Sequence, residues 1–164
     1  MDKSPSFWWG DLMHRVIRII VGAEDEIEAR ETAESLLNET IENGSTGMDY
    51  GTFFDEASEV SGESRWGARP VASRISSKEG KQLLLEGLNF DFEEFKRSVS
   101  EVKKIINRDL TELYKDFIGL YHFRKCDDPQ FVLSEMGFIK VEDVNALLNK
   151  KDNNLWIVPC DVHY

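Results

Sequence analysis

The first part of the chain alternates between apolar and polar side chains, which predicts a β-strand over residues 12–22. One face of this strand is apolar, whereas the other is only half apolar and carries His14, Val16, Arg18 and Ile20. Residues 23–43 follow with apolar side chains at spacings of three and four, which predicts a helix that ends at Gly44. A strand that leads directly into a helix favours packing of that helix back on the sheet.

The longest apolar pattern of helical spacing covers residues 91–122, where Asp91 and Glu94 resemble a capping box. A helix of that length would run about 48 Å, whereas a domain of this size is only about 40 Å across. We therefore expect one of two arrangements. Either a core helix breaks near residues 107–109, or the helix projects and pairs with a second copy of the chain.

Shorter patterns complete the predicted order of elements. Further strands and helices are expected over residues 50–54 (strand), 70–76 (strand), 129–136 (helix), 141–149 (helix) and 155–164 (strand). The order β-α-β-β-α-β predicts a single α+β domain over residues 1–164. We expect a small, mostly antiparallel sheet packed with helices, including the long amphipathic one, as in an enlarged ferredoxin-like sandwich.

Composition narrows the class of protein. The chain has 164 residues, of which 41% are hydrophobic, and this predicts one domain with a packed core. No apolar run approaches the ~20 residues that cross a bilayer, and residues 1–10 do not have the pattern of a signal peptide. The two cysteines, Cys126 and Cys160, form no CxxC motif, so free thiols in a reducing cytoplasm are expected.

The net charge of −11 argues against direct binding to nucleic acid or to an anionic membrane, because both need basic side chains. Residues 24–63 contain thirteen acidic residues and a single basic one, Arg30, and we call them the acidic segment. The next stretch, residues 64–81, contains five basic residues and one acidic residue. One interpretation is a solvated acidic face, partly neutralised by Arg65, Arg69, Arg74, Lys78 and Lys81. The other is a surface that meets a positively charged partner.

Helix stability explains the positions of only some glutamates along the predicted helix, so both interpretations stay open. Acidic residues in the first turn are stabilised by the helix dipole. Further along, like charges three residues apart cost about 0.2–0.5 kcal/mol per pair, so stability alone does not favour them. The residues expected to contact a basic partner are Glu28, Glu31, Glu34, Glu39, Glu42, Asp55, Glu56, Glu59 and Glu63.

The last predicted strand carries the residue types best suited to chemistry. Asp161 and His163 are two residues apart and share one face, and the first strand offers His14 and Arg18 on its mixed face. If the two strands are neighbours, His14, Asp161 and His163 form an acid–base group or a metal site, with Asp161 and His163 as the metal ligands. The alternative is an ordinary surface pair of histidine and aspartate.

Common motifs for cofactors and nucleophiles are absent from the sequence. It contains no GxxxxGKS/T, GxGxxG, GxSxG or HExxH motif, so no cofactor is expected. Cys126 precedes two aspartates, which disfavour a thiolate, and Cys160 lies on the apolar face of the last strand. Neither thiol is therefore expected to act as a nucleophile.

Three stretches together resemble small proteins of phages and other prokaryotic mobile elements. They are the opening HRVIRIIVGAEDEIEAR, the mid-chain stretch that ends in Arg65-Trp66, and the closing LWIVPCDVHY. In place of the glycine pair that usually precedes Arg-Trp, this chain has Glu63-Ser64. The resemblance covers roughly a third of the chain and implies no activity. It does imply a phage or archaeal setting, in which small acidic proteins often bind host proteins.

The sequence thus supports three functional hypotheses. The first is an acidic protein-binding module that occupies a basic, nucleic-acid-binding surface of a host protein, as an inhibitor of a nuclease or defence complex would. The second is a small metal-dependent phosphoester hydrolase that uses His14, Asp161 and His163. The third is a structural role, with a homodimer formed through residues 91–122.

Overall fold

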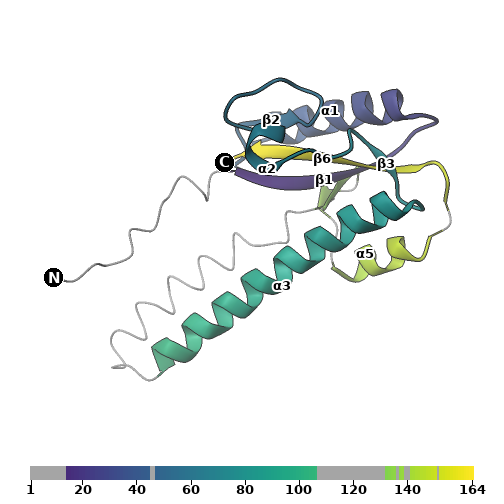
Figure 1. Ribbon diagram of the computed structural model, residues 1–164. Coiled ribbons are helices and arrows are strands. Elements are labelled where there is room, and N and C mark those ends of the chain that lie inside the picture. The colour runs from purple at the N-terminus through teal and green to yellow at the C-terminus, as the bar shows by residue number, and fades with distance from the viewer. Residues whose placement is uncertain (1–13, 45–46, 107–131, 136, 139–140, 151) are drawn as a thin grey trace.

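The computed structural model describes residues 14–44, 47–106, 132–135, 137–138, 141–150 and 152–164. Its elements in chain order are β1 (His14–Gly22), α1 (Glu26–Glu42), β2 (Tyr50–Phe53), α2 (Glu63–Trp66), β3 (Ser73–Arg74), α3 (Lys78–Ile106), β4 (Val132–Ser134), β5 (Gly137–Phe138), α5 (Val141–Leu148) and β6 (Leu155–His163) (Figure 1). No helix within these ranges is long and apolar enough to cross a membrane.

The sheet is built around β1 and β6, which pair antiparallel along their whole length, with His14 opposite His163. The strand order is β2-β6-β1-β4-β5, and β3 also pairs with β6. Among the described strands, only β4 runs parallel to its neighbour, β1. Strands β2 and β3 share one edge of β6 and leave a gap at Val158 and Pro159, where the proline has no backbone N–H to donate.

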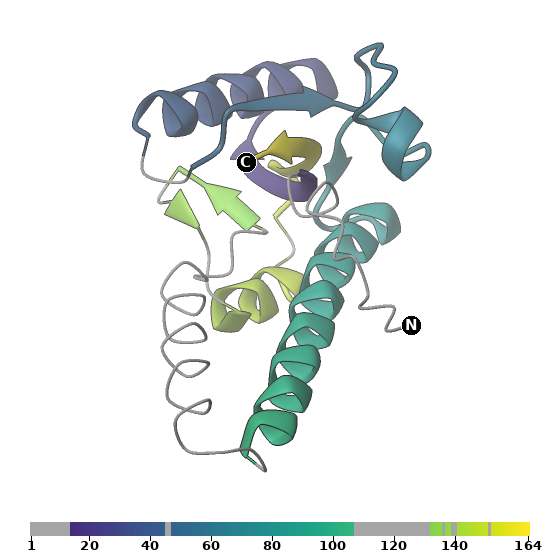
Figure 2. The same cartoon turned by 90° about the vertical axis from the view of Figure 1, so that its left-hand side faces the viewer.

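Helices cover both faces of this sheet (Figures 1 and 2). On one face, Ala33 and Leu37 of α1 pack in a core with Ile19 of β1. On the other face, Leu84 of α3 packs in a second core with Ile20 of β1. The two cores exist because successive residues of a strand point to opposite faces of the sheet.

Helix α1 is fixed at both ends by its own sequence. Asp25 is the N-cap residue, and its carboxylate accepts a hydrogen bond from the Glu28 amide at 2.9 Å. The Glu28 carboxylate accepts one in return from the Glu24 amide at 2.7 Å. At the other end the chain leaves the helix at Gly44, which has a φ of +64°. Because the buried side of α1 faces the sheet, its glutamates lie toward solvent.

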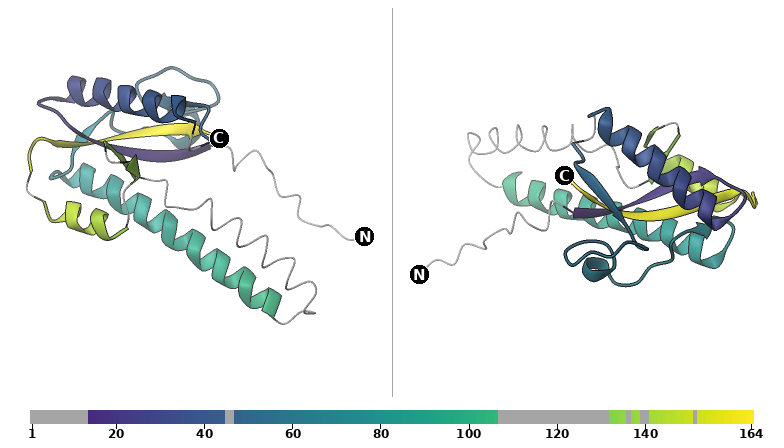
Figure 3. Two further views of the ribbon diagram at one scale, coloured as in Figure 1. Left: turned by 180° about the vertical axis from the view of Figure 1, so that it is seen from behind. Right: turned by 90° about the horizontal axis from the view of Figure 1, so that it is seen from above.

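Helix α3 begins against the sheet and continues past it (Figure 3). Ser77 precedes its first turn, and its hydroxyl accepts a hydrogen bond from the Gly80 amide at 3.0 Å, as an N-cap residue does. The helix has 29 residues. At 1.5 Å per residue it is therefore roughly 43 Å long.

Most of the predicted elements are confirmed, as is the α+β class with a mostly antiparallel sheet. The confirmed elements are the strands near residues 12–22, 50–54, 70–76 and 155–164 and the helices near residues 23–43 and 141–149. The arrangement differs in detail from a ferredoxin-like sandwich, in which both helices cover one face of the sheet. Here α1 and α3 lie on opposite faces (Figure 3).

Two helix predictions need correction. The helix predicted over residues 129–136 is wrong, because Val132–Ser134 form β4, and pairing with β1 outweighs a weak helical pattern. The helix predicted to start at Asp91 starts at Lys78 instead, so Asp91 lies inside α3 and does not cap it. Residues 107–122 are outside the described part of the chain. The break near residues 107–109 and the dimer through residues 91–122 therefore remain predictions.

Candidate functional site

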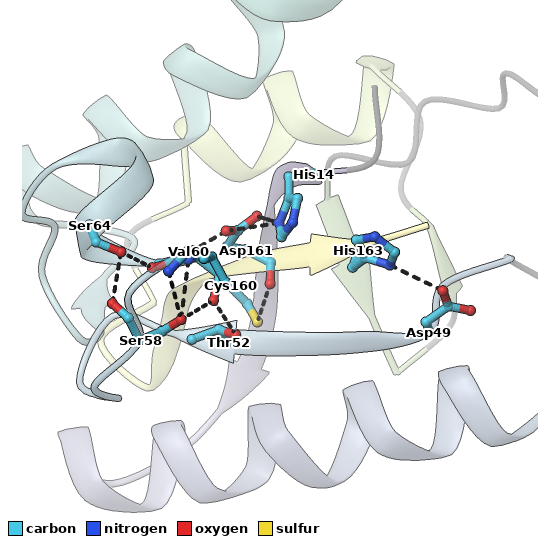
Figure 4. Close-up of polar contacts among 11 residues, drawn as sticks. His14, Asp49, Thr52, Ser58, Val60, Ser64, Cys160, Asp161 and His163 are labelled. Atoms are coloured by element: carbon cyan, nitrogen blue, oxygen red, sulfur yellow. Dashed lines mark hydrogen bonds and ion pairs between the residues drawn. The ribbon is translucent and has the colours of Figure 1, made fainter. Parts of the chain in front are cut away.

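The two central strands bring His14 and Asp161 into direct contact. His14 is the first residue of β1, and its cross-strand partner on β6 is His163. Asp161 lies two residues before His163. The Nδ1 atom of His14 is 3.2 Å from Oδ1 of Asp161 (Figure 4). Asp161 is 0% exposed and His14 is 9% exposed. A carboxylate removed from water in this way needs hydrogen-bond donors, and His14 supplies one of them.

The second donor to Asp161 comes from the loop that follows β2. The Gly62 amide donates to Oδ2 of Asp161 at 2.9 Å, and its φ of +59° favours glycine at this position. Next to it, the Ser61 hydroxyl donates to the Thr52 hydroxyl of β2 at 2.9 Å and lies 2.6 Å from the Ser58 hydroxyl (Figure 4). Asp161 and its neighbours thus fasten this loop to the sheet.

His163 lies beside His14 but its hydrogen-bond partner is a different carboxylate. The centroids of the two imidazole rings are 5.0 Å apart, and the His163 ring stacks on Tyr50 at 4.9 Å. The Nδ1 atom of His163 is 3.1 Å from Oδ2 of Asp49 (Figure 4). The structure therefore brings His14 and Asp161 together through a hydrogen bond, and it adds His163 only through a ring contact.

Arg18 does not join this group. Its guanidinium donates to the Leu83 carbonyl oxygen at 3.1 Å and pairs with Glu86 of α3 at 3.6 Å. Arg69 pairs with the same carboxylate at 2.5 Å. Burial by itself would raise the pKa of Glu86. The hydrogen bond and charge of Arg69, together with the charge of Arg18, outweigh burial and hold that pKa below its usual value.

The His14–Asp161 pair orients an imidazole. A carboxylate at Nδ1 leaves Nε2 to accept or give a proton, which is the arrangement used in acid–base chemistry. Within the described residues, however, no three His, Cys, Asp or Glu side chains are placed to hold a metal ion. The neighbouring Cys160 is fully buried with the α1 core, and burial raises the pKa of its thiol well above the usual value. Its role is therefore packing.

The acidic segment is organised by its one basic residue. The Arg30 guanidinium lies 3.6 Å from the centroid of the Phe53 ring. It binds the carboxylates of Glu34 at 2.8 Å, Asp55 at 3.0 Å and Glu56 at 2.6 Å. Burial alone would lower the pKa of Arg30, but the hydrogen bonds to Asp55 and Glu34 raise it. Arg30 thus neutralises part of the segment and joins α1 to the chain that follows β2.

Other carboxylates of the acidic segment have no counter-ion among the described residues. Glu31, Glu39 and Glu42 are exposed along the outer side of α1, and no basic side chain pairs with any of them in the part of the chain that the structure describes. Glu59 and Glu63, in the loop and in the first turn of α2, are exposed and unpaired among the same residues. These five carboxylates belong to the uncompensated part of the acidic surface, together with the acidic residues at the start of α1.

Two of the arginines expected to neutralise this surface bind elsewhere. Arg69 pairs with Glu86 of α3, as described above. Arg74 donates to the carbonyl oxygens of Asn153 and Glu24, and its guanidinium lies 4.7 Å from the Trp156 ring centroid. The charge of residues 64–81 is therefore directed partly toward α3 and β6.

A family model matches residues 13–164, which include every helix and strand described above. The chain belongs to the DUF7995 family. DUF7995 is described as a domain of unknown function. No curated protein and no solved structure matches the chain. The region matched by the DUF7995 model thus includes both the His14–Asp161 pair and the acidic surface. The family description assigns no activity to either of them.

Three contacts in this DUF7995 protein have no signal in the sequence, namely those of Gly62, Asp49 and Tyr50. Gly62 is 99 residues from Asp161, and Asp49 is 114 residues from His163. Such distant partners leave no spacing that identifies them. Arg30 is different, because a single base among thirteen acidic residues is visible in the sequence as a candidate hub.

Proposed function

We propose that this DUF7995 protein is a protein-binding module without enzymatic activity, and that its acidic surface occupies a basic surface of its partner. One observation carries the proposal: Glu31, Glu39 and Glu42 are exposed on α1 with no basic partner among the described residues. Repulsion between Glu39 and Glu42, which are three residues apart on the helix, costs stability. The last turn of α1 also has no basic residue, although the helix dipole favours one there. Binding to a basic surface supplies the missing counter-ions.

The chemistry of the partner follows from the spacing of the carboxylates. Glutamates three or four residues apart on a helix are about 5–6 Å from each other. This spacing is on the order of that between neighbouring phosphates, so a surface that binds nucleic acid fits the acidic face of α1. The resemblance to proteins of phages supports a specific form of the proposal, an inhibitor that covers such a surface on a host nuclease or defence complex.

Reversing Glu31, Glu39 and Glu42 to lysine together is expected to abolish binding to the partner. Like charges facing each other across an interface cost several kcal/mol, so the affinity is expected to fall at least ~100-fold. The measurement is affinity capture from the native host at low and high salt, followed by calorimetric titration of the captured protein. Capture by the native sequence is expected at low salt and is expected to be lost at high salt.

A matched control makes the same change of charge elsewhere. Glu93, Glu135 and Asp143 are exposed outside the acidic segment, and their joint change to lysine is expected to leave binding intact. Equal loss in both triple variants would indicate that only the net charge matters. That result, or full binding by the α1 variant, would reject the proposal.

A second candidate function, the small metal-dependent phosphoester hydrolase, is supported by the contact between His14 and Asp161. In this candidate, His163 leaves Asp49 and completes a metal site with the other two side chains. Calorimetric titration with Mn²⁺ and Zn²⁺ tests it. Binding that disappears in His163→Ala would support the hydrolase, whereas no binding, or equal binding by His163→Ala, would reject it.

A further inference from the structure

The two most exposed large hydrophobic side chains of the described residues both lie in the acidic segment. Ile27, in the first turn of α1, is 71% exposed, and Val60, in the loop after β2, is 66% exposed. Single exposed apolar side chains are ordinary on protein surfaces. These two differ because unpaired carboxylates flank them: Glu31 lies one helical turn beyond Ile27, and Glu59 and Glu63 bracket Val60.

The loop that carries Val60 is held in place on both sides of the valine. The Val60 amide donates to the Ser58 hydroxyl at 3.3 Å. The next residue, Ser61, is only 2% exposed and its hydroxyl donates to Thr52, while Gly62 is bound to the buried Asp161 (Figure 4). Val60 therefore points outward from a fixed backbone. A side chain held in this way loses little conformational freedom when it binds a partner.

Ile27 also extends from a fixed element, and ion pairs join this element to the segment that precedes Val60. The N-cap bond of Asp25 fixes the turn that carries Ile27. Arg30, one turn further along α1, binds Asp55 and Glu56 in the segment that leads from β2 toward Val60. This cluster of ion pairs fixes α1 relative to that segment. Ile27 and Val60 are therefore presented by one rigid part of the molecule.

We propose that Ile27 and Val60 are the apolar anchors of the acidic surface, and that the partner presents apolar depressions rimmed by lysine and arginine. This inference rests on the proposed function and specifies the chemistry of the partner. Charged contacts at the rim of an interface mainly govern the rate of association. Apolar side chains buried at its centre, and shielded from water by the rim, supply most of the binding energy. The acidic surface contains both kinds of side chain.

The experiment uses a defined probe, a library of random peptides displayed on yeast and selected on the immobilised full-length protein. The selected peptides are expected to combine lysine or arginine with aliphatic or aromatic residues. Fluorescence anisotropy then measures their affinity for the native sequence, Ile27→Ser and Val60→Ser. Each substitution is expected to weaken binding about tenfold. The salt dependence is expected to stay unchanged, because no charge is removed.

The matched control is Leu85→Ser, which removes a hydrophobic side chain that is 46% exposed on α3, outside the acidic segment. It is expected to bind the peptides as the native sequence does. Basic peptides that bind both anchor variants undiminished would overturn this inference and leave the proposed function standing. Selected peptides without basic residues would overturn both. The same conclusion would follow if the native protein selected no more peptides than the variant Glu31→Lys, Glu39→Lys, Glu42→Lys.

Discussion

Asp161→Ala is expected to lower the free energy of unfolding by about 3 kcal/mol, because it leaves two buried donors without an acceptor. The Asp161 carboxylate is 0% exposed and is the hydrogen-bond partner of both His14 Nδ1 and the Gly62 amide. Each buried donor left without a partner costs roughly 1–3 kcal/mol. Urea unfolding, followed by the fluorescence of the tryptophans, measures the change.

Asp143→Ala is the control for this prediction, since Asp143 is an exposed aspartate on α5 and its loss is expected to change the stability by less than about 0.5 kcal/mol. Hydrogen exchange adds a local measurement, because the Gly62 amide is expected to exchange faster in Asp161→Ala. An Asp161→Ala protein as stable as the native sequence, with a protected Gly62 amide, would contradict the role assigned to this carboxylate.

Gly80→Ala is expected to lower the free energy of unfolding by about 2 kcal/mol, although alanine is the better helix former. In a helix interior, alanine in place of glycine normally adds about 1 kcal/mol of stability. A Cβ atom at position 80, however, would overlap the carbonyl oxygen of Arg74 and lie 3.0 Å from the Cα atom of Ile75. Both are backbone atoms, and β3 is paired with β6, so relief requires α3 to move away from the sheet.

Gly87→Ala is a control in the same helix. Its Cβ atom would meet only the side chain of Arg18, at 3.5 Å or more, which is ordinary van der Waals contact. The helix propensity of alanine therefore dominates, and a gain of up to about 1 kcal/mol is expected. Thermal and urea unfolding of the two variants are expected to shift in opposite directions. A shift in the same direction would contradict the close approach of α3 to β3.

Asp161 connects the stability of the domain with the proposed binding surface. Its bond to Gly62 fixes the loop that presents Val60. Loosening this loop adds an ordering cost to binding, because the chain must be fixed again when it meets the partner. Asp161→Ala is therefore expected to weaken peptide binding as well as stability, even though the carboxylate itself is fully buried and reaches no partner.

The sequence predicts best those elements whose formation depends on their own residues. The alternation in residues 12–22 and the helical spacing in residues 23–43 are local patterns, and both elements form as expected. The start of α3 is harder to predict, because Gly80 weakens the local helical pattern just after the N-cap residue Ser77. Strand β4 forms through its pairing with β1, which no local pattern reveals.

The candidate site divides in the same way. The two-residue repeat of a strand is enough to predict that Asp161 and His163 share one face of the last strand. It likewise predicts that His14 and Arg18 share one face of the first strand. Which of these side chains meet depends on the register of β1 with β6. It also depends on α3, because Arg18 forms an ion pair with Glu86 of that helix. His163 forms a hydrogen bond with Asp49 instead, and Asp49 comes from a segment remote in sequence.

By itself, the sequence determined the α+β class and the concentration of acidic residues between residues 24 and 63. Only the tertiary structure decided which of those acids are compensated. Arg30 reaches Asp55 and Glu56, which are 25 and 26 residues away, while Glu31, on the same helix, stays exposed. Periodicity and charge counts are local properties of a chain. Ion pairing and burial depend instead on which side chains folding brings within hydrogen-bond distance.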